Sequence, residues 1–229
     1  MSVIQLPHQD DILITPWYEH FDPAQRLIRG KAYLHLKRAL DLLLCVLALP
    51  FLLVGFVICG ILIKFDSSGP ILLKQQRTGR GGKLFGMYKF RTMVSNAEEL
   101  KQELTHLNEL RWPDFKITND PRVTRVGRIL RKTSLDELPQ IINVIKGEMS
   151  LVGPRPTSFG SDTYLLWQTE RLDVTPGITG LWQIEGRAET EFDERLRLDI
   201  AYIERRSLWL DINILIRTIL VVFNGRGAH

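Results

Sequence analysis

The sequence predicts an α+β fold that is mostly helical, with one membrane-embedded segment and a small β-hairpin. Three observations predict it: a long apolar run, a glycine-rich turn between two apolar stretches after it, and later segments rich in helix formers. The 229 residues suffice for one domain with a real hydrophobic core. The net charge is only +4, but basic residues gather between Lys64 and Lys132, which indicates an anionic partner.

Residues 1–30 are polar, contain three prolines and show no clear period, so we expect a loosely ordered arm. They lack the basic start and apolar stretch of a signal peptide. Cys45 and Cys59 lie inside the apolar run and are expected to behave as small hydrophobic residues. Because the sequence contains neither Cys-x-x-Cys nor His-x-x-x-His spacing, a zinc site is not expected.

The apolar run covers residues 39–63 and carries a single charge, at its start. As a straight helix it would measure about 37 Å, enough for a hydrocarbon core of roughly 30 Å. Pro50, near its middle, removes a helix hydrogen bond and favours a kink. Basic residues flank both ends, Lys37 and Arg38 before and Lys64 after, so the positive-inside rule gives no direction. A spanning helix and a helix-break-helix hairpin that returns to the same side both fit.

A β-hairpin is predicted for residues 70–93, where apolar and alternating stretches flank the turn at 79–82. Its basic residues suit either a solvated surface near a membrane or a cradle for phosphate. These residues are Arg77, Arg80, Lys83, Lys89 and Arg91.

Two helices are predicted after the hairpin. Residues 95–110 begin with serine, a preferred cap residue, and are rich in helix formers, which is typical of a surface helix. In DPRVTRVGRILRKTS, residues 120–134, Arg125, Arg128 and Arg131 recur at every third position and share one helical face. Such a face suits phosphates or anionic lipid.

Two adjacent carboxylates, Asp136 and Glu137, follow Ser134 in the stretch KTSLDELPQ. Ser-x-x-Glu fits a capping box, in which each side chain bonds the other residue's backbone amide. The stretch alone favours capping over catalysis. A short helix is expected from here to Gly147.

Two loops rich in glycine and proline follow. The turn at 153–156, Gly-Pro-Arg-Pro, holds Arg155 at a fixed angle, which suits bidentate binding of an oxyanion as well as a purely structural turn. Residues 175–187 contain three glycines, which would let the backbone approach a ligand closely. Residues 207–223 are strongly apolar and fit an interfacial helix or a buried core helix. If exposed, this helix would suit a homodimer.

Four blocks of the sequence occur in order: KFRTM at 89–93, DPRVTRVGRILRKTSLDELPQIINVIKGEMSLVGPRP at 120–156, PGITGLWQIEGR at 176–187 and LDIAYIERRSLWLDINILIRT at 198–218. Together they resemble the bacterial sugar transferase family, the monotopic phosphoglycosyl transferases that begin polyprenol-linked glycan assembly. The resemblance runs from about residue 36 to residue 223 and is to the short catalytic form of the family.

The resemblance implies a Mg²⁺-dependent transfer of a sugar 1-phosphate from a UDP-sugar to undecaprenyl phosphate, with release of UMP. This is the first membrane step of exopolysaccharide, capsule, O-antigen or glycoprotein glycan synthesis. Asp136 matches the family's nucleophile, and an ionised aspartate can form a covalent aspartyl-phosphosugar intermediate. Glu137 matches the acidic partner expected to hold Mg²⁺. The resemblance therefore favours chemistry at this pair, although Ser134 could still cap the helix.

The resemblance assigns further site residues. Lys89 and Arg155 match basic residues that bind phosphate, and Asp211 matches an acidic residue associated with the site. Arg187, at the end of the glycine-rich loop, is a candidate for binding the nucleotide phosphate. No motif identifies the sugar that is transferred.

The family also favours the re-entrant membrane helix, with Lys37 and Arg38 at its basic beginning and Pro50 at its break. The expected partners are UDP-sugar, undecaprenyl phosphate and membrane lipid, and not nucleic acid. The protein is expected on the cytoplasmic face of the bacterial inner membrane. The expected organisation is an N-terminal arm at 1–35, a re-entrant membrane helix at 36–64 and a catalytic domain at 65–229.

The alternative outside enzymology is a membrane-anchored basic scaffold that binds acidic lipid or nucleic acid through the arginine face. Its binding would depend steeply on salt and would be indifferent to the loss of Asp136. Exposed aromatic residues for base stacking are not interleaved with the basic run, which argues against nucleic acid.

Overall fold

The computed structural model describes residues 31–109, 115, 117–158, 160, 163–185 and 192–223. Its α-helices are α1 (Lys31–Asp66), α2 (Ala97–Glu103), α3 (Arg125–Lys132), α4 (Gln140–Lys146), α5 (Leu181–Glu185), α6 (Phe192–Arg205) and α7 (Leu208–Phe223). Its strands are β1 (Leu72–Thr78), β2 (Leu84–Phe90), β3 (Ser150–Val152) and β4 (Gly177–Thr179). Its short 3₁₀ helices are η4 (Arg80–Gly82), η5 (Thr105–Leu107), η6 (Leu135–Glu137) and η8 (Leu166–Asp173). The prediction of a mostly helical chain with a small β-hairpin is confirmed, and the parallel pairing of β3 with β4 was not predicted.

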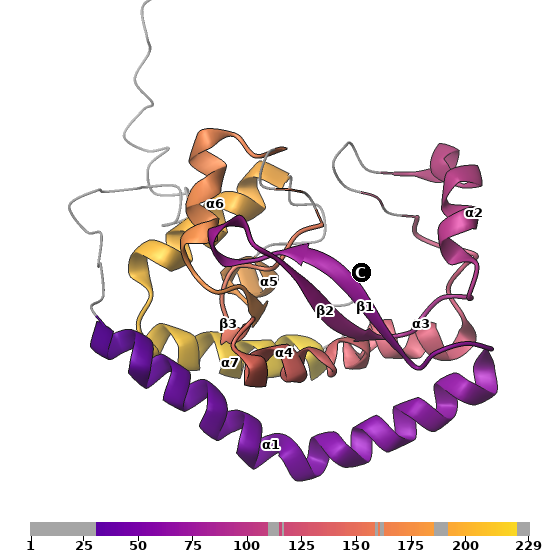
Figure 1. The fold of residues 1–229 in the computed structure, drawn as a ribbon, viewed down its shortest axis with the longest axis horizontal. Coiled ribbons are helices and arrows are strands. Elements are labelled where there is room, and N and C mark those ends of the chain that lie inside the picture. The colour runs from indigo at the N-terminus through magenta and orange to yellow at the C-terminus, as the bar shows by residue number, and fades with distance from the viewer. Residues whose placement is uncertain are drawn as a thin grey trace, which may run out of the picture.

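Helix α1 lies beneath a row formed by α7, α4 and α3 (Figure 1). It is one continuous helix of 36 residues with Pro50 inside it, and Figure 1 shows it bent near its middle. A proline inside a helix commonly causes such a bend, because it removes a backbone donor. The sequence left a spanning helix and a helix-break-helix hairpin open, and the resemblance favoured the hairpin. The structure has a single bent helix, and the re-entrant topology stays a prediction. By length and composition, α1 could cross a membrane.

The beginning of α1 is tied to the rest of the protein by its two basic residues. Lys37 Nζ donates a hydrogen bond to Asp211 Oδ2 at 3.0 Å. Arg38 donates to the backbone carbonyl oxygens of Val144 and Ile145 at 2.6 and 2.9 Å, at the end of α4. Cations favour such carbonyl-rich helix ends. Both residues, predicted at the membrane anchor, are therefore engaged within the protein.

The far end of α1 is tied to the same domain. Asp66 Oδ2 accepts a hydrogen bond from the Val126 amide at 2.8 Å. Arg91, which follows β2, donates to the carbonyl oxygen of Ser67 at 2.7 Å. Between the two ends, the buried and free thiols of Cys45 and Cys59 belong to two separate core clusters that join α1 to the domain.

Strands β1 and β2 pair antiparallel and confirm the predicted hairpin. Its turn places Gly81 and Gly82 at φ 64° and 75°, a left-handed conformation that glycine adopts without steric cost. Side chains of directly opposed residues share a face of the sheet. The face that carries Met87, which is buried against α4, therefore also carries Lys89 and Arg77.

The predicted surface helix at 95–110 is shorter in the structure, because α2 ends at Glu103 and is followed by η5. Asn96 occupies its N-cap position and makes no side-chain cap bond. The serine predicted as the cap, Ser95, is therefore outside that position. This part of the chain packs away from the hairpin, at one end of the molecule (Figure 1).

Strand β3 pairs in parallel with β4, with Ser150 opposite Gly177. A Cβ atom on Gly153 would lie 2.7 Å from the carbonyl oxygen of Thr175, and one on Gly180 would lie 2.4 Å from the carbonyl oxygen of Gly153. Both distances are impossible for a real side chain. These glycines therefore let the protein's own backbone segments approach one another, which gives Gly180, in the predicted glycine-rich loop, a structural reason apart from any ligand.

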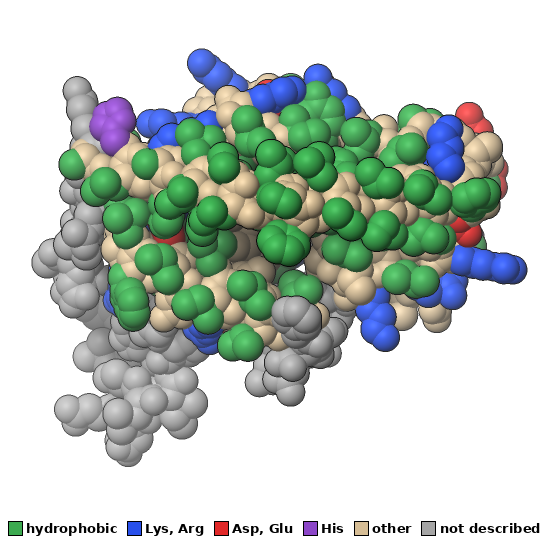
Figure 2. Space-filling model, turned by 90° about the horizontal axis from the view of Figure 1, so that it is seen from below, with side chains coloured by type: hydrophobic (Ala, Val, Ile, Leu, Met, Phe, Trp, Pro, Cys, Tyr) green, Lys and Arg blue, Asp and Glu red, His purple; other side chains and the backbone are tan. Residues whose placement is uncertain are grey.

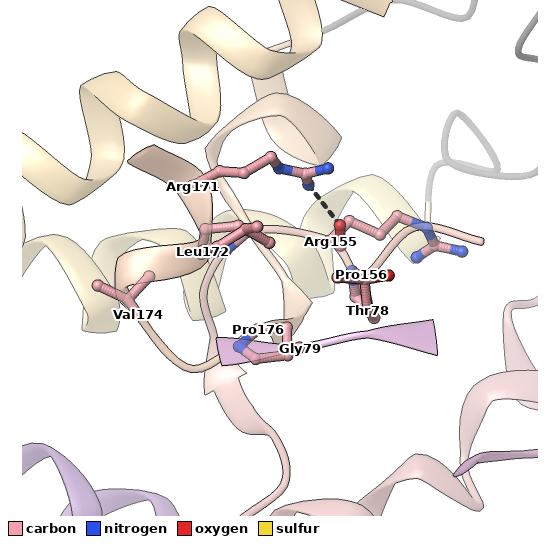
Figure 3. Close-up of a pocket in the computed structure, with 9 residues that line it drawn as sticks. Thr78, Gly79, Arg155, Pro156, Arg171, Leu172, Val174 and Pro176 are labelled. Carbon is pink, nitrogen blue, oxygen red and sulfur yellow. Dashed lines mark hydrogen bonds between the residues drawn. The ribbon is translucent and has the colours of Figure 1, made fainter. Parts of the chain in front are cut away.

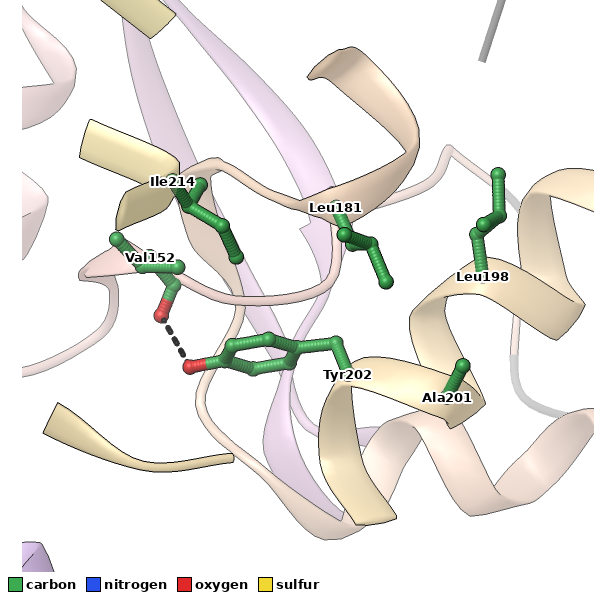
Figure 4. Packing of buried hydrophobic residues seen from close by; sticks show 6 residues of the cluster. All are labelled: Val152, Leu181, Leu198, Ala201, Tyr202 and Ile214. Carbon is green, nitrogen blue, oxygen red and sulfur yellow. Dashed lines mark hydrogen bonds between the residues drawn. The ribbon is translucent and has the colours of Figure 1, made fainter. Parts of the chain in front are cut away.

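A core cluster joins β3 to α5, α6 and α7. Tyr202 lies at its centre, and its hydroxyl donates to the carbonyl oxygen of Val152 at 3.3 Å (Figure 4). Burying each aliphatic side chain in such a cluster stabilises the fold by about 1.5–3 kcal/mol. The buried members are Val152, Leu181, Leu198, Ala201, Tyr202 and Ile214.

Large apolar side chains cover the face of the molecule on which α1 lies (Figure 2). Phe51 and Phe65 on α1 are 81% and 88% exposed, and Trp209 on α7 is 75% exposed. Lysine and arginine side chains lie around the edge of this apolar face. Soluble monomers rarely expose so large a patch, which marks it as an interaction surface. The sequence predicted either an interfacial helix or a buried core helix at residues 207–223. In the structure, Ile214 of α7 is fully buried in the core, whereas other residues of α7 are exposed.

Candidate active site

The acid pair lies in η6, a single turn between α3 and α4. Ser134, just before it, has a φ of 55°, a left-handed conformation that residues other than glycine seldom adopt. Its side chain makes no capping hydrogen bond. The predicted capping box is therefore wrong, and neither Asp136 nor Glu137 is committed to a helix end.

Glu137 is bound by two cations. Lys89 Nζ donates to Oε1 at 2.8 Å. Arg155 donates through Nη1 to Oε2 at 3.1 Å and through Nη2 to Oε1. Burial alone would raise the pKa of Glu137, but the charges of Arg155 and Lys89 hold it well below its usual range. These contacts connect β2, η6 and the turn after β3, and they confirm that the three residues lie together.

Asp136 is 8% exposed and lies beside the same lysine, with Lys89 Nζ 3.6 Å from Oδ2. Burial raises the pKa of Asp136, and the charge of Lys89 opposes that rise. Within the described part of the chain, Asp136 accepts no hydrogen bond, whereas Glu137 accepts three. The oxygens of Asp136 are thus available to an electrophile, while Glu137 holds the surrounding cations in place.

Arg171 stabilises the turn that carries Arg155. Arg171 Nη2 donates to the carbonyl oxygen of Arg155 at 2.5 Å and to Asp199 Oδ2 at 2.6 Å. In Figure 3 the Arg155 carbonyl faces Arg171, and its guanidinium extends away from it. A small pocket lies beside this turn, between Thr78 at the end of β1 and Leu172 in η8. The buried pair of Arg171 and Asp199 therefore holds the backbone of Arg155 in place, while Glu137 holds its guanidinium.

Arg131 lies near the acid pair although it was not among the predicted site residues. Its charge acts on Asp136, and its Nε donates to Thr92 Oγ1 at 3.0 Å. Arg125 and Arg128, with which it shares a sequence period, are exposed. The three arginines of the predicted face are therefore in different environments, because Arg131 is partly buried and the other two are exposed. Their regular spacing in the sequence does not reveal this difference in burial.

Arg77 was predicted only as one of five hairpin residues that suit a phosphate cradle, and not as a residue of the acid-pair site. It lies close enough to Arg155 and Glu137 for both charges to act on it. The alternation of the hairpin strands could have indicated this, because it places Arg77 on the face that carries Lys89. Using this alternation requires the register between the two strands, and the register depends on which residues form the turn.

Asp211 lies in a different cluster. It accepts hydrogen bonds from the Tyr33 hydroxyl at 3.1 Å, the Lys37 ammonium at 3.0 Å and the Tyr202 hydroxyl at 2.7 Å. These contacts hold α1 against α6 and α7, and the described contacts do not bring Asp211 to the acid pair. Arg187, the other predicted phosphate-binding residue, lies outside the described residues.

Glu137 retains limited capacity for a metal ion. Its Oε1 accepts from both Lys89 and Arg155, but Oε2 accepts a single bond, and a carboxylate oxygen offers two lone pairs. The described residues contain no group of three side chains that could hold a metal by themselves. Because Mg²⁺ is commonly bound by one or two carboxylates together with substrate phosphates, this donor set fits an ion shared with the substrate.

Four cations lie around the two acids of the pair. This clustering of positive charge favours a multiply charged anion. The cations are Arg77, Lys89, Arg131 and Arg155, and the carboxylates are Asp136 and Glu137. A buried, unbonded carboxylate surrounded by cations is suited to attack on a phosphoryl group.

The sequence model of a family described as bacterial sugar transferase matches residues 32–225. A galactosyl transferase, CpsE, of Streptococcus agalactiae is 46% identical over 184 residues, which are 77% of this chain and 41% of the relative. An undecaprenyl-phosphate galactose phosphotransferase of Salmonella typhimurium is 49% identical over 166 residues, 70% of this chain and 35% of the relative. The exopolysaccharide production protein ExoY of Rhizobium meliloti is 39% identical over 213 residues, 90% and 92% of the two chains. The chain thus spans less than half of the first two relatives and most of the third.

Proposed function

This chain belongs to the bacterial sugar transferase family, and from that premise we propose that it transfers a sugar 1-phosphate from a UDP-sugar to undecaprenyl phosphate and releases UMP. The reaction would begin the assembly of a bacterial polysaccharide. The observation that carries the proposal is the contrast within the acid pair, where Asp136 has unbonded oxygens and Glu137 binds two cations. The name of the Salmonella typhimurium relative supports the lipid acceptor.

The proposed reaction has two displacements. An oxygen of Asp136 attacks the phosphorus that bears the sugar, so that an aspartyl O–P bond forms while the bond to the UMP oxygen breaks. A phosphate oxygen of undecaprenyl phosphate then attacks the same phosphorus and releases the Asp136 carboxylate. The products are UMP and an undecaprenyl diphosphate sugar. Each step exchanges one P–O bond for another, so no oxidant or further reactant is needed.

The surrounding cations support both steps. Lys89 lies between the two acids and can contact the phosphoryl oxygens as Asp136 attacks. Arg155, held by Glu137 in front and by Arg171 behind, offers a fixed guanidinium to the diphosphate. Glu137 would hold Mg²⁺, and the ion would supply further positive charge beside the diphosphate.

The membrane placement follows from α1. Both of its ends contact the same domain, Lys37 through Asp211 and Asp66 through Val126, which supports a helix that enters the bilayer and returns to the same side. The apolar face with its basic edge suits a bilayer surface with anionic headgroups. The proposed location is the cytoplasmic face of the inner membrane, where UDP-sugars are available. The homodimer and the domain boundaries stay predictions.

The topology can be tested by labelling. In a chain whose two cysteines are replaced by alanine, His35→Cys and Ser68→Cys place single thiols at exposed positions beside the two ends of α1. A membrane-impermeant maleimide is expected to label both variants in inside-out vesicles and neither in intact spheroplasts. Labelling of the two positions from opposite sides would establish a spanning helix and overturn the re-entrant topology.

The activity can be tested with the purified chain in nanodiscs. With Mg²⁺, undecaprenyl phosphate and a panel of UDP-sugars, one sugar is expected to release UMP and form a lipid diphosphate product. Without the lipid, the same sugar is expected to add the mass of its phosphosugar to the protein. UMP release without an adduct would retain the transfer but reject the covalent step. A folded chain that releases no UMP with any sugar would favour the basic scaffold instead.

A further inference from the structure

Arg77 and Lys89 lie at opposite ends of one face of the hairpin. Arg77 is opposite Phe85, and Lys89 is four residues farther along the same strand, a separation of about 13 Å between their backbones. The amide of Thr78 donates to the carbonyl oxygen of Thr157 at 3.0 Å. This bond ties the end of β1 to the chain just after Arg155. The acid pair therefore has Lys89 at one end and Arg77 near Arg155 at the other.

The hydrogen-bonding capacity of Arg77 is largely unused. Its Nε is buried and has no hydrogen-bond partner among the described residues. Its Nη2 donates to Gln75 Oε1 at 3.1 Å, and no ion pair joins it to a carboxylate in the described part of the chain. Arg155, by contrast, uses both terminal nitrogens on Glu137. A guanidinium with an unmatched buried donor beside this site suits a phosphate oxygen.

The local electrostatics agree with an anionic ligand at Arg77. Burial, and then repulsion by Arg155, lower the pKa of the Arg77 guanidinium, while Glu137 opposes that change. A phosphate bound between Arg77 and Arg155 would remove this repulsion between two cations. The site would then exchange an unfavourable pair of like charges for two charge-assisted hydrogen bonds.

The positions of the two cations on the hairpin indicate which phosphate Arg77 would meet. Lys89 Nζ lies 3.6 Å from Asp136 Oδ2, whereas the backbone of Arg77 lies about 13 Å away from that of Lys89 along the same face. Lys89 is therefore the cation beside Asp136, and Arg77 is at the far end of the face. In the proposed reaction the sugar-bearing phosphate must contact Asp136, so the second phosphate of the donor extends away from it.

We propose that Arg77 binds the phosphate that leaves with the nucleoside, an assignment that rests on the proposed transfer reaction. When the bond between the two phosphates breaks, the bridging oxygen stays with the leaving phosphate, which gains negative charge. The Arg77 guanidinium faces that charge and stabilises it, while Lys89 remains with the transferred phosphoryl group. The same contact holds UMP in the site until it dissociates.

The test measures binding of UMP, which requires no turnover. The parental chain, Arg77→Gln and Arg77→Lys are titrated with UMP and Mg²⁺ by calorimetry in nanodiscs. Arg77→Gln is expected to weaken UMP binding about 10- to 100-fold, the effect of losing one charge-assisted contact. Arg77→Lys is expected to fall between the two, because it keeps the charge without the planar fork. Arg80→Gln, which removes an exposed charge from the turn of the same hairpin, is the matched control and is expected to bind as the parent does.

The outcomes separate this assignment from the proposed function. If the parental chain transfers sugar phosphate but Arg77→Gln binds UMP as tightly as the parent, Arg77 does not contact the leaving phosphate and the function stands. An equal loss in Arg80→Gln would also reject the assignment, because it would reflect general charge. If no UDP-sugar reacts, yet UMP binding falls selectively in Arg77→Gln, the phosphate contact stands and the transfer is wrong. Should Arg77→Gln fail to fold, parental affinity in Arg77→Lys would reject the bidentate contact.

Discussion

Asp136→Asn is expected to abolish both UMP release and formation of the phosphosugar adduct, with a loss of about 10⁴-fold or more. The amide has nearly the same shape as the carboxylate but lacks its charge, so it cannot attack phosphorus. Because Asp136 accepts no hydrogen bond in the described part of the chain, the substitution is expected to leave the fold intact. Intact-protein mass measures the adduct, and a coupled assay measures UMP.

Asp173→Asn is the matched control, since Asp173 is an exposed aspartate in η8. It is expected to retain the adduct and the rate of UMP release. An adduct that persists in Asp136→Asn would show that another residue is the nucleophile. Full UMP release from Asp136→Asn without an adduct would instead indicate direct transfer between the two substrates.

Asp199→Ala is expected to lower the free energy of unfolding by about 3–5 kcal/mol, since it leaves the Arg171 guanidinium buried without its carboxylate. The pair joins α6 to η8 at 2.6 Å, with both side chains almost completely buried. At about 2–4 °C for each kcal/mol in a domain of this size, the thermal midpoint should fall by roughly 6–20 °C. Glu194→Ala, an exposed acid on the same helix, is the control and should have little effect.

A double substitution tests whether the loss arises from the unpaired charge. Asp199→Leu combined with Arg171→Met removes both charges and is expected to recover much of the stability, because a buried ion pair often contributes little over apolar residues. A double variant no more stable than Asp199→Ala would show that the contact of Arg171 with the Arg155 carbonyl is the larger contribution.

The pH dependence of stability gives a separate readout of the same pair. Burial raises the pKa of Asp199 to about 6, although the charge of Arg171 opposes the rise. The folded chain thus binds this proton more tightly than the unfolded chain, whose aspartates titrate near pH 4. The contribution of Asp199 to the free energy of unfolding should therefore fall as the pH rises from about 4 to about 6. Asp199→Asn is expected to remove that slope.

Local patterns in the sequence were enough to predict the elements that depend on neighbouring residues alone. The apolar run predicted α1, and the glycine-rich turn predicted the hairpin. Gly147, with a φ of 83°, ends α4 as expected. The capping box failed because Ser134 adopts a left-handed conformation, which a spacing rule does not detect. The shortened α2 reflects the same limit, since helix formers alone do not fix where a helix stops.

The site itself depends on contacts between distant segments. Lys89 and Arg155 are 48 and 18 residues from Glu137, and only the family resemblance brought them together before the structure did. That resemblance did not indicate that Arg77 lies beside them, because this requires the strand register. It also associated Asp211 with the site, whereas in the structure its buried carboxylate serves to hold α1.

The bonds between Asp211 and the beginning of α1 constrain the order in which the chain can assemble. Lys37 and Asp211 are 174 residues apart, whereas Asp66, at the far end of α1, finds its partner only 60 residues later. Between these two, Arg38 reaches the carbonyl oxygens of Val144 and Ile145, which follow it by 106 and 107 residues. During synthesis, the far end of α1 can therefore be held first and Arg38 next, and the loop between Lys37 and Asp211 must close last. A ribosome that stalls before Asp211 would leave a nascent chain with its whole acid pair made but with Lys37 still lacking its carboxylate partner.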